Sequence, residues 1–296
     1  MKRLLRALLP AAAYDALAAG RDRLRRLHPE RRRRRREFDR GQQGLPAGEM
    51  ALRPGLVLRV DDRSREAFEF FCFRSLEMAR ELDAFLDARA SHHRFLDVGA
   101  LYGVFSLAFT AGRPDAEALA VDPSPAAQEV LRSNLARNAH CRVQLATEAL
   151  GAGTGTVTMR REWHHLEAVA ENEPSTDLLH LPTISLDQLC ESRGFVPDLV
   201  KIDVEGYEHQ VLVGAQQTLQ QARPKIFLEV HPTRLKALGS SAEHVVQTLA
   251  NLGYTLNPVD GRGLSSCLKQ AQVFRLVAKT SPEFPVITPR FFRPSR

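Results

Sequence analysis

Apolar and polar residues along the chain follow two different periods. Short apolar runs that end in an acid or a glycine are typical of buried strands, whereas apolar positions three and four residues apart predict amphipathic helices. From residue 94 onward the two kinds of segment alternate. The predicted strands are 94–99, 117–122, 142–150, 153–160, 198–206, 225–230, 254–259 and 271–279, and the predicted helices are 103–111, 124–138, 207–221 and 241–252.

Repeated strand–helix units predict an α/β domain in which helices cover both faces of a mostly parallel sheet. Before them, residues 56–60 indicate one short strand, and residues 64–90 carry apolar side chains between charges, as a helix or a helix pair does. No internal repeat is visible. The pattern therefore predicts one domain over residues 45–296, preceded by an extension over residues 1–44.

Charge is distributed unevenly between these two parts. Residues 1–40 contain 14 Lys and Arg against 5 Asp and Glu, and the remainder contains 27 against 30. The extension includes six consecutive arginines, Arg31–Arg36, and leads into a glycine-rich linker, Gly41–Gly48. Such a run is typical of a helical or disordered solvated segment. The alternatives are peripheral contact with an anionic membrane through residues 1–40, and binding of another polyanion.

The remaining composition limits the class of protein. A hydrophobic fraction of 44% is ordinary for a globular domain. Four scattered cysteines lack the spacing of a metal site, which predicts reduced thiols. No apolar run is long enough for a membrane span. The apolar stretch at the N-terminus is interrupted by Pro10, Tyr14 and Asp15, which makes it unlike a secretory signal. We therefore expect a cytoplasmic protein, and the slightly acidic body indicates no specific nucleic-acid partner.

The stretch D-V-G-A-L-Y-G, Asp97–Gly103, lies at the first strand–helix turn. Ligands of doubly wound sheets bind at such turns, and Gly99 and Gly103 would let the backbone approach one closely. The G-x-G-x-x-G pattern of nicotinamide-dependent dehydrogenases is absent. Asp97 suits the cationic amino-acid end of S-adenosylmethionine better than a pyrophosphate. Asp122, which ends the next predicted strand, either accepts both ribose hydroxyls or serves only as a helix-entry residue.

Further polar residues follow two later strands. Asp203 and Glu205 either face a bound donor or acceptor or form only an acidic helix start. His231 is the first candidate for a base that removes a proton from an acceptor hydroxyl, and its alternative is a structural or substrate-shaping role. A divalent metal held by these two acids and Glu229 is a further alternative. Because no dedicated cage is visible, we expect no metal.

Several segments, taken in order, resemble the FkbM-type S-adenosylmethionine-dependent methyltransferases. K-I-D-V-E-G-Y-E followed by V-L-V-G-A is the most specific of them. The resemblance extends over residues 66–260, with the core motifs at 94–260. The other segments are F-L-D-V-G-A-L-Y-G-V-F-S-L, V-D-P-S-P, L-R-S-N-L-A-R-N, E-A-L-G-A-G-T-G-T-V-T-M, T-I-S-L-D-Q-L and R-P-K-I-F-L-E-V-H-P.

This resemblance implies a seven-stranded Rossmann-like sheet with a reversed last strand. It implies S-adenosyl-L-methionine as cofactor and methyl transfer to a small hydroxylated acceptor, such as a sugar, a glycolipid or a natural product. The implied cofactor-binding residues are Asp97, Gly99, Gly103, Asp122, Glu148 and Asp203. From their positions and chemistry, as argued above, the candidate catalytic residues are Asp203, Glu205 and His231.

Two features depart from the family pattern. Leu101 stands where the family usually has Asn, and the arginine-rich extension has no counterpart. Two other hypotheses therefore stay open beside the enzyme. One is a catalytically degenerate protein that binds the cofactor without turnover, and the other is a scaffold that associates with membranes or polyanions through its extension.

Overall fold

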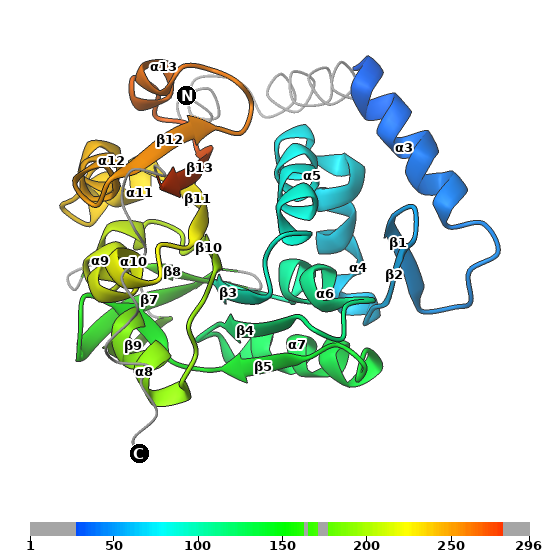
Figure 1. The fold of residues 1–296 in the computed structure, drawn as a ribbon, viewed down its shortest axis with the longest axis horizontal. Coiled ribbons are helices and arrows are strands. Elements are labelled where there is room, and N and C mark those ends of the chain that lie inside the picture. The colour runs from blue at the N-terminus through cyan, green and yellow to red at the C-terminus, as the bar shows by residue number, and fades with distance from the viewer. Residues whose placement is uncertain (1–27, 163–164, 171–176, 281–296) are drawn as a thin grey trace.

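The central element of the fold is a seven-stranded sheet (Figure 1). The structure is a computed structural model, which describes residues 28–162, 165–170 and 177–280. Expectations for residues 1–27 lie outside these ranges. The strand order is β12–β13–β11–β10–β3–β4–β5. The strands are β3 (Arg94–Val98), β4 (Glu117–Val121), β5 (Val143–Ala146), β10 (Leu199–Ile202), β11 (Lys225–Val230), β12 (Tyr254–Pro258) and β13 (Phe274–Thr280).

Strand direction confirms the expected fold class. β3, β4, β5, β10 and β11 pair in parallel, whereas β13 runs antiparallel to both β11 and β12. The sheet is therefore mixed, with one reversed strand, and this strand is the last along the chain. A mostly parallel Rossmann-like sheet brings the carboxyl ends of its central strands to one edge, where ligands of such folds bind.

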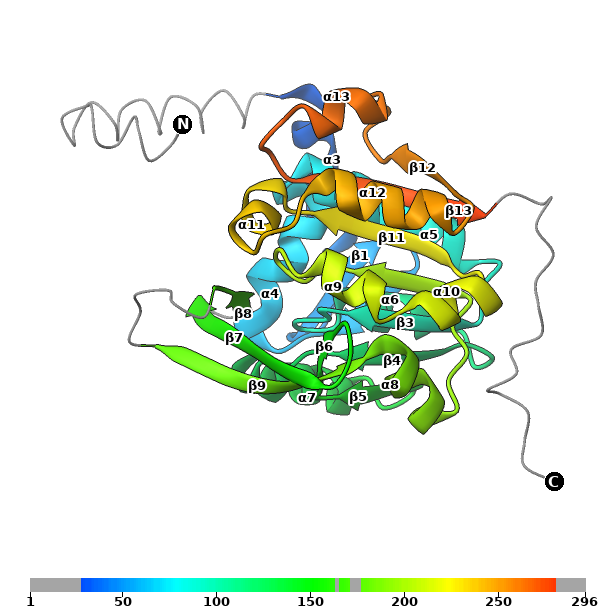
Figure 2. The same cartoon turned by 90° about the vertical axis from the view of Figure 1, so that its left-hand side faces the viewer.

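Helices cover both faces of this sheet, as Figure 2 shows from the side of α9 and α12. One face is covered by α4 (Asp62–Glu69), the π-helix η1 (Phe70–Arg74), α5 (Leu76–Arg89), α6 (Val104–Thr110) and α7 (Pro125–Arg137). The other is covered by α8 (Leu186–Arg193), α9 (Glu208–Val213), α10 (Gln216–Gln221), α11 (Pro232–Ala237), α12 (Ala242–Asn251) and α13 (Leu264–Leu268).

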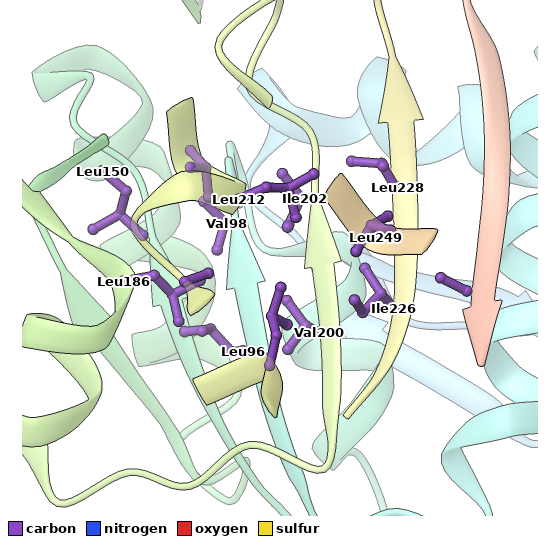
Figure 3. Close-up of a cluster of buried hydrophobic side chains, with 14 of the residues drawn as sticks. Leu96, Val98, Leu150, Leu186, Val200, Ile202, Leu212, Ile226, Leu228 and Leu249 are labelled. Atoms are coloured by element: carbon purple, nitrogen blue, oxygen red, sulfur yellow. The ribbon is translucent and has the colours of Figure 1, made fainter. Parts of the chain in front are cut away.

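Alternation along the strands gives each face its own core. On the α9 and α12 side, aliphatic residues of β3, β10 and β11 pack together, among them Leu96, Val200 and Leu228 (Figure 3). On the α5 side the core is aromatic. The Phe85 ring lies 4.9 Å from the ring centroids of Phe95 and Phe105 and 5.6 Å from that of Phe227. These pairs are tilted or edge-on, which is the favoured geometry between aromatic rings.

A second sheet, which the sequence pattern did not predict as such, lies beside the first. Its order is β6–β9–β7–β8, with β6 (Ala149–Gly151), β7 (Gly155–Glu162), β8 (His165–Ala168) and β9 (Leu178–Ser185). The prediction of one strand over 142–150 was wrong, because the chain leaves the central sheet after Ala146 and resumes as β6 in the second sheet. β6 then pairs in parallel with β9.

The predicted helix over 207–221 is also interrupted. It forms α9 and α10, separated at Gly214 and Ala215. A Cβ at Gly214 would lie 2.1 Å from the carbonyl oxygen of Gly151 in β6. The helix therefore breaks where the main chain of the second sheet passes against it.

The arginine run forms a helix, which is one of the two expected conformations. It lies in α3 (Pro29–Gly41), whose Phe38 ring is 4.9 Å from that of Phe73 in η1. A hairpin of β1 (Glu49–Arg53) and β2 (Leu56–Arg59) follows, and the Gln42 side chain bonds both main-chain groups of Ala51. The described part of the extension thus packs against the body. No helix of the described ranges has the length and apolarity needed to cross a membrane.

We expect Phe85→Ala to lower the free energy of unfolding by about 3–5 kcal/mol, because it removes the ring at the centre of a fully buried aromatic cluster. Urea denaturation followed by circular dichroism measures this. The control is Phe70→Ala, whose ring is 41% exposed and which should cost about 1 kcal/mol or less. Equal losses in the two variants would contradict the assigned core.

Candidate functional site

A cavity of about 120 Å³ opens at the carboxyl ends of β3, β4 and β10. The main-chain turns that follow these strands form one side of it, and the second sheet forms the other. Three acids, Asp122, Asp203 and Glu205, line it together. The remaining lining residues are Gly99, Leu101, Pro123, Met159, His165, Leu166 and Val204. The structure therefore brings Asp122 together with two acids that lie 81 and 83 residues later in the sequence.

Asp122 connects two of these turns. Its Oδ2 accepts a hydrogen bond from the Leu101 amide at 2.7 Å, and its Oδ1 accepts one from the Ser124 amide at 2.9 Å. Burial raises the pKa of Asp122 to about 7, although the two amides favour the carboxylate form. Each carboxylate oxygen has a second lone pair, so the side chain can still accept hydrogen bonds from a ligand.

Leu101 lies in the left-handed region, at φ 49°. Such a conformation costs a residue with a Cβ about 1 kcal/mol. Glu205, which lines the same cavity, is also left-handed at φ 53°. Strained residues of this kind persist where the surrounding structure holds them, and they cluster at functional sites.

The two glycines of the first motif have packing roles. Gly99 has φ 81°, and a Cβ there would lie 1.8 Å from the carbonyl oxygen of Asp203. Gly103 has φ 80°, and a Cβ there would lie 2.5 Å from the Leu131 side chain. The predicted reason for these glycines was close approach of a ligand. In the structure each faces a neighbouring part of the protein, and only Gly99 also lines the cavity.

Asp97 lies beneath the turn and does not line the cavity. It is 1% exposed, and its Oδ2 accepts hydrogen bonds from the amide and the hydroxyl of Ser106 at 3.2 and 2.7 Å. Burial raises the pKa of Asp97 to about 6, against the opposing effect of Lys201. Direct contact between Asp97 and a cofactor stays a prediction. Its bonds to Ser106 show that it holds the start of α6.

Lys201 is a fully enclosed cation in β10, 2% exposed. Its Nζ donates to Asp203 Oδ2 at 2.9 Å and lies 4.8 Å from the centroid of the Phe105 ring. Burial disfavours a charged carboxylate at Asp203, but the Lys201 ammonium outweighs it and holds the pKa of Asp203 well below its usual range. Asp203 is therefore a permanent anion on the cavity wall.

His231 is held on both sides by carboxylates. Its Nδ1 lies 2.7 Å from Glu208 Oε1, and its Nε2 lies 3.0 Å from Glu205 Oε2. Burial alone would lower the pKa of His231, but the hydrogen bond and charge of Glu208, together with the other acids, raise it above the ordinary value. His231 is not among the residues that line the cavity. This geometry is that of an imidazolium within an ion-pair network.

Glu205 is the acid through which this network reaches the cavity. Its Oε2 contacts His231 and also pairs with Nη1 of Arg234. Its Oε1 lies 3.9 Å from Nε2 of His165, which lines the opposite side of the cavity from β8. In the sequence His165 belongs to a histidine pair, 164–165, that has no spaced partner, which favours a surface histidine over a site residue. Its place opposite Glu205 depends on β8, which was not predicted.

A layer of buried charge continues behind the cavity. Arg275 of β13 donates to Glu229 Oε1 at 2.6 Å and to Glu81 Oε2 at 2.9 Å. The pKa of Glu229 is raised to about 8, first by burial and then by the charge of Asp203. Glu148, one of the implied cofactor-binding residues, pairs with Arg193 at 2.9 Å and is not among the cavity-lining residues.

Asp203, Glu205 and His231 form the group that could hold a metal ion, since one ligand atom from each lies within 4.8 Å of the others. Each of them already has a partner of opposite charge. Asp203 bonds Lys201, Glu205 bonds Arg234, and His231 lies between two glutamates. A divalent cation would have to displace these contacts, so the arrangement favours an internal ion-pair network.

Comparison with known families adds one match. The model of the methyltransferase FkbM domain matches residues 97–256, which is more than half of the chain and includes all three acids of the cavity. None of the curated proteins compared with the chain matches it.

Several solved structures have a partly similar course of the chain. A methyltransferase FkbM from Methylobacillus flagellatus KT is 17% identical, with a TM-score of 0.42 over 63% of this chain and 43% of that one. The N-terminal domain of EvdMO1, in the presence of SAH and D-fucose, is 14% identical, with a TM-score of 0.42 over 70% and 84%. An O-methyltransferase family protein from Burkholderia thailandensis is 11% identical, with a TM-score of 0.42 over 75% and 60%. The chain thus spans less than half of the first of these proteins.

We expect the free energy of unfolding to fall as the pH rises from about 5 to about 8. Asp97, Asp122 and Glu229 have raised pKa values in the folded state, so the folded protein retains protons that the unfolded chain releases above pH 4. The raised pKa of His231 acts in the same direction, because its contribution is complete below the unfolded pKa and is lost as the pH passes the folded one.

Urea unfolding at pH 5 and pH 8 measures this dependence. Asp122→Asn keeps the size of the side chain but removes its titration, so the fall in stability with pH should be smaller in that variant. A wild-type protein that becomes more stable between these pH values would show that the buried carboxyls do not titrate as described.

Proposed function

The chain belongs to the FkbM methyltransferase family, and we propose that it transfers the methyl group of S-adenosylmethionine to a hydroxyl oxygen of a sugar, a glycolipid or a natural product. Family membership supports methyl transfer with this cofactor. The observation that carries the proposal is the shared cavity of Asp122, Asp203 and Glu205 at the carboxyl ends of β3, β4 and β10. This edge is where ligands of doubly wound sheets bind.

The residues around the first turn fit the nucleoside part of the cofactor. The carboxylate of Asp122 is held in place by the main-chain amides of Leu101 and Ser124. Such an acid can accept hydrogen bonds from a ribose diol. Leu101, Pro123 and Met159 add an apolar wall. Ligand pockets have volumes of roughly 300–1,000 Å³, so a cavity of about 120 Å³ would have to widen for a whole cofactor to enter it.

Bound S-adenosylmethionine supplies an activated methyl carbon, which leaves binding, orientation and deprotonation of the acceptor to the protein. A hydroxyl has a pKa far above 7, so a base must take its proton as the methyl–oxygen bond forms. Asp203 is a weak base because Lys201 neutralises it, and both nitrogens of His231 are engaged. Glu205 is likewise paired, with Arg234 and His231. His165, which faces Glu205 across the cavity, is therefore our proposed proton acceptor, and Glu205 is the anion that orients it and stabilises its protonated form.

In this proposal His231 is a positioning residue. It holds Glu205 in its left-handed conformation, together with Arg234, while Glu208 fixes the other side of the imidazole ring. A fixed acid next to the acceptor reduces the rearrangement that proton transfer needs. The sequence-based hypothesis of His231 as the base is thus changed to a role that acts through Glu205.

Asp122→Ala should weaken binding of S-adenosylmethionine by about 10–100-fold, because it removes the ribose acceptor and also frees the amides of Leu101 and Ser124. Isothermal titration measures this. In the wild-type protein the affinity should rise between pH 6 and pH 8, since the carboxylate accepts from hydroxyls more strongly than the neutral acid. Asp122→Glu keeps the charge and should retain most of the binding. Unchanged affinity in Asp122→Ala would exclude this residue from the cofactor site.

His165→Ala and Glu205→Gln should each lower turnover about 10²-fold or more while the affinity for the cofactor stays within a fewfold of wild type. The measurement is methyl transfer from labelled cofactor to pooled hydroxylated metabolites. His244→Ala, at an exposed position of α12, is the matched histidine control and should leave turnover unchanged. Cofactor binding without turnover in the wild-type protein would instead support the degenerate hypothesis.

A further inference from the structure

Helix α3 has an inner face that attaches it to the body. Glu30, Arg34 and Phe38 lie four residues apart along this face and are partly buried. Arg34 donates to Glu30 at 3.1 Å and pairs with Asp83 of α5 at 2.7 Å. Arg80 of α5 also reaches Glu30, and the Phe38 ring packs on Phe73. These contacts fix both the position of α3 and its rotation about its own axis.

The outer face of α3 carries Arg32, Arg36 and Arg40, which are all exposed. Side chains four residues apart lie one above another on a helix, about 5–6 Å apart at Cβ. Each of these three arginines lies two residues from a residue of the inner face, which corresponds to a rotation of about 200° around the helix axis. The outer stripe, as we call these three arginines, is therefore directed away from the body.

The outer stripe also differs from its neighbours in its charge partners. Arg35 pairs with Asp39 at 2.8 Å, and Arg33 lies 3.7 Å from Glu37. Within the part of the chain that the structure describes, no ion pair involves any of the three stripe arginines. Within the run, Arg34 anchors the helix and Arg33 and Arg35 are paired within it. Arg32 and Arg36, together with Arg40 beyond the run, form the set that is left for an external anion.

We propose that the outer stripe docks the protein on the surface of an anionic phospholipid membrane. A guanidinium group binds phosphate through two parallel hydrogen bonds, which suits lipid headgroups. The body beyond residue 40 has an excess of acids, 30 against 27 basic residues, so the molecule is polarised and approaches an anionic surface with α3 leading. This inference does not rest on the proposed function.

The sequence before α3 favours a membrane over a nucleic acid. Residues 1–27 connect directly to the first turn of α3 and combine basic residues with leucines, as in K-R-L-L-R-A-L-L. Such a composition is typical of segments that lie in a membrane interface, where basic residues meet headgroups and leucines enter the acyl boundary. Binding of nucleic acid would use the charges but not the leucines.

The test is co-sedimentation of the full chain with vesicles of phosphatidylcholine alone or with 30% phosphatidylglycerol. The wild-type protein should bind only the anionic vesicles, and less strongly at 300 mM than at 50 mM salt. Replacing the outer stripe with glutamine, R32Q/R36Q/R40Q, should weaken binding roughly 100-fold, or about fivefold for each arginine. Because the stripe makes no ion pair, the variant should keep the melting temperature of the wild-type protein.

The matched control is R132Q/R137Q/K279Q, which removes the same charge from exposed positions of the body. It should bind anionic vesicles within about twofold of wild type. Equal loss in the two variants would show that net charge alone is responsible and would overturn the proposal. Wild-type binding in R32Q/R36Q/R40Q would also overturn it. Stripe-dependent binding to duplex RNA, with no binding to vesicles, would identify a nucleic acid as the partner instead.

Discussion

The enclosed charge of Lys201 is the constraint on which the arrangement of the site depends. An ammonium group with no water around it costs several kcal/mol unless an anion stays in contact with it. Asp203 is that anion, at 2.9 Å. Because Asp203 is the first residue after β10, the pair fixes the place where the strand ends. The Asp203 carbonyl then lies so close to Gly99 that no Cβ fits between them. One ion pair thus joins the acidic turn to the glycine turn.

The aromatic core and the charged layer support each other through α5. Phe85 lies in the aromatic cluster, and Glu81, one turn earlier on the same helix, bonds Arg275 in the layer above. The rings exclude water from below, so the charges of the layer interact through a medium of low dielectric constant and hold one another strongly. Acids fixed in this way keep their orientation toward the cavity before any ligand arrives, which is the arrangement that electrostatic catalysis needs.

Two acids of the cavity have pKa values that their surroundings shift in opposite directions. Asp203 has an ammonium group in contact and remains ionised, whereas Asp122 has only main-chain amides and its pKa rises to about 7. Both side chains line one cavity. Carboxyl groups whose surroundings separate their pKa values can take different roles at one pH. Here the permanent anion lies beside the proposed acceptor position, and the titrating acid lies at the proposed nucleoside end.

Much of the fold and part of the site could be predicted from the sequence. Buried parallel strands such as β3 and β10 are short apolar runs, and the acids that follow such strands must meet at one edge of the sheet, as Asp122 and Asp203 do. The second sheet could not be predicted, because its pairing is long-range and Pro182 interrupts the period of β9. His165 was therefore missed. Glu208 was missed because its contact with His231 joins a helix to a different strand end.

Leu101 shows why a departure from the family pattern need not remove the turn. The usual Asn tolerates the left-handed conformation that Leu101 adopts, so the leucine makes the turn costlier by about 1 kcal/mol. The turn is held instead by the Leu101 amide, which donates to Asp122, and any residue except proline has that donor. The leucine side chain then joins Pro123 and Leu166 on the cavity wall. The substitution thus leaves the binding geometry to the main chain and adds apolar surface to the cavity that the three acids share.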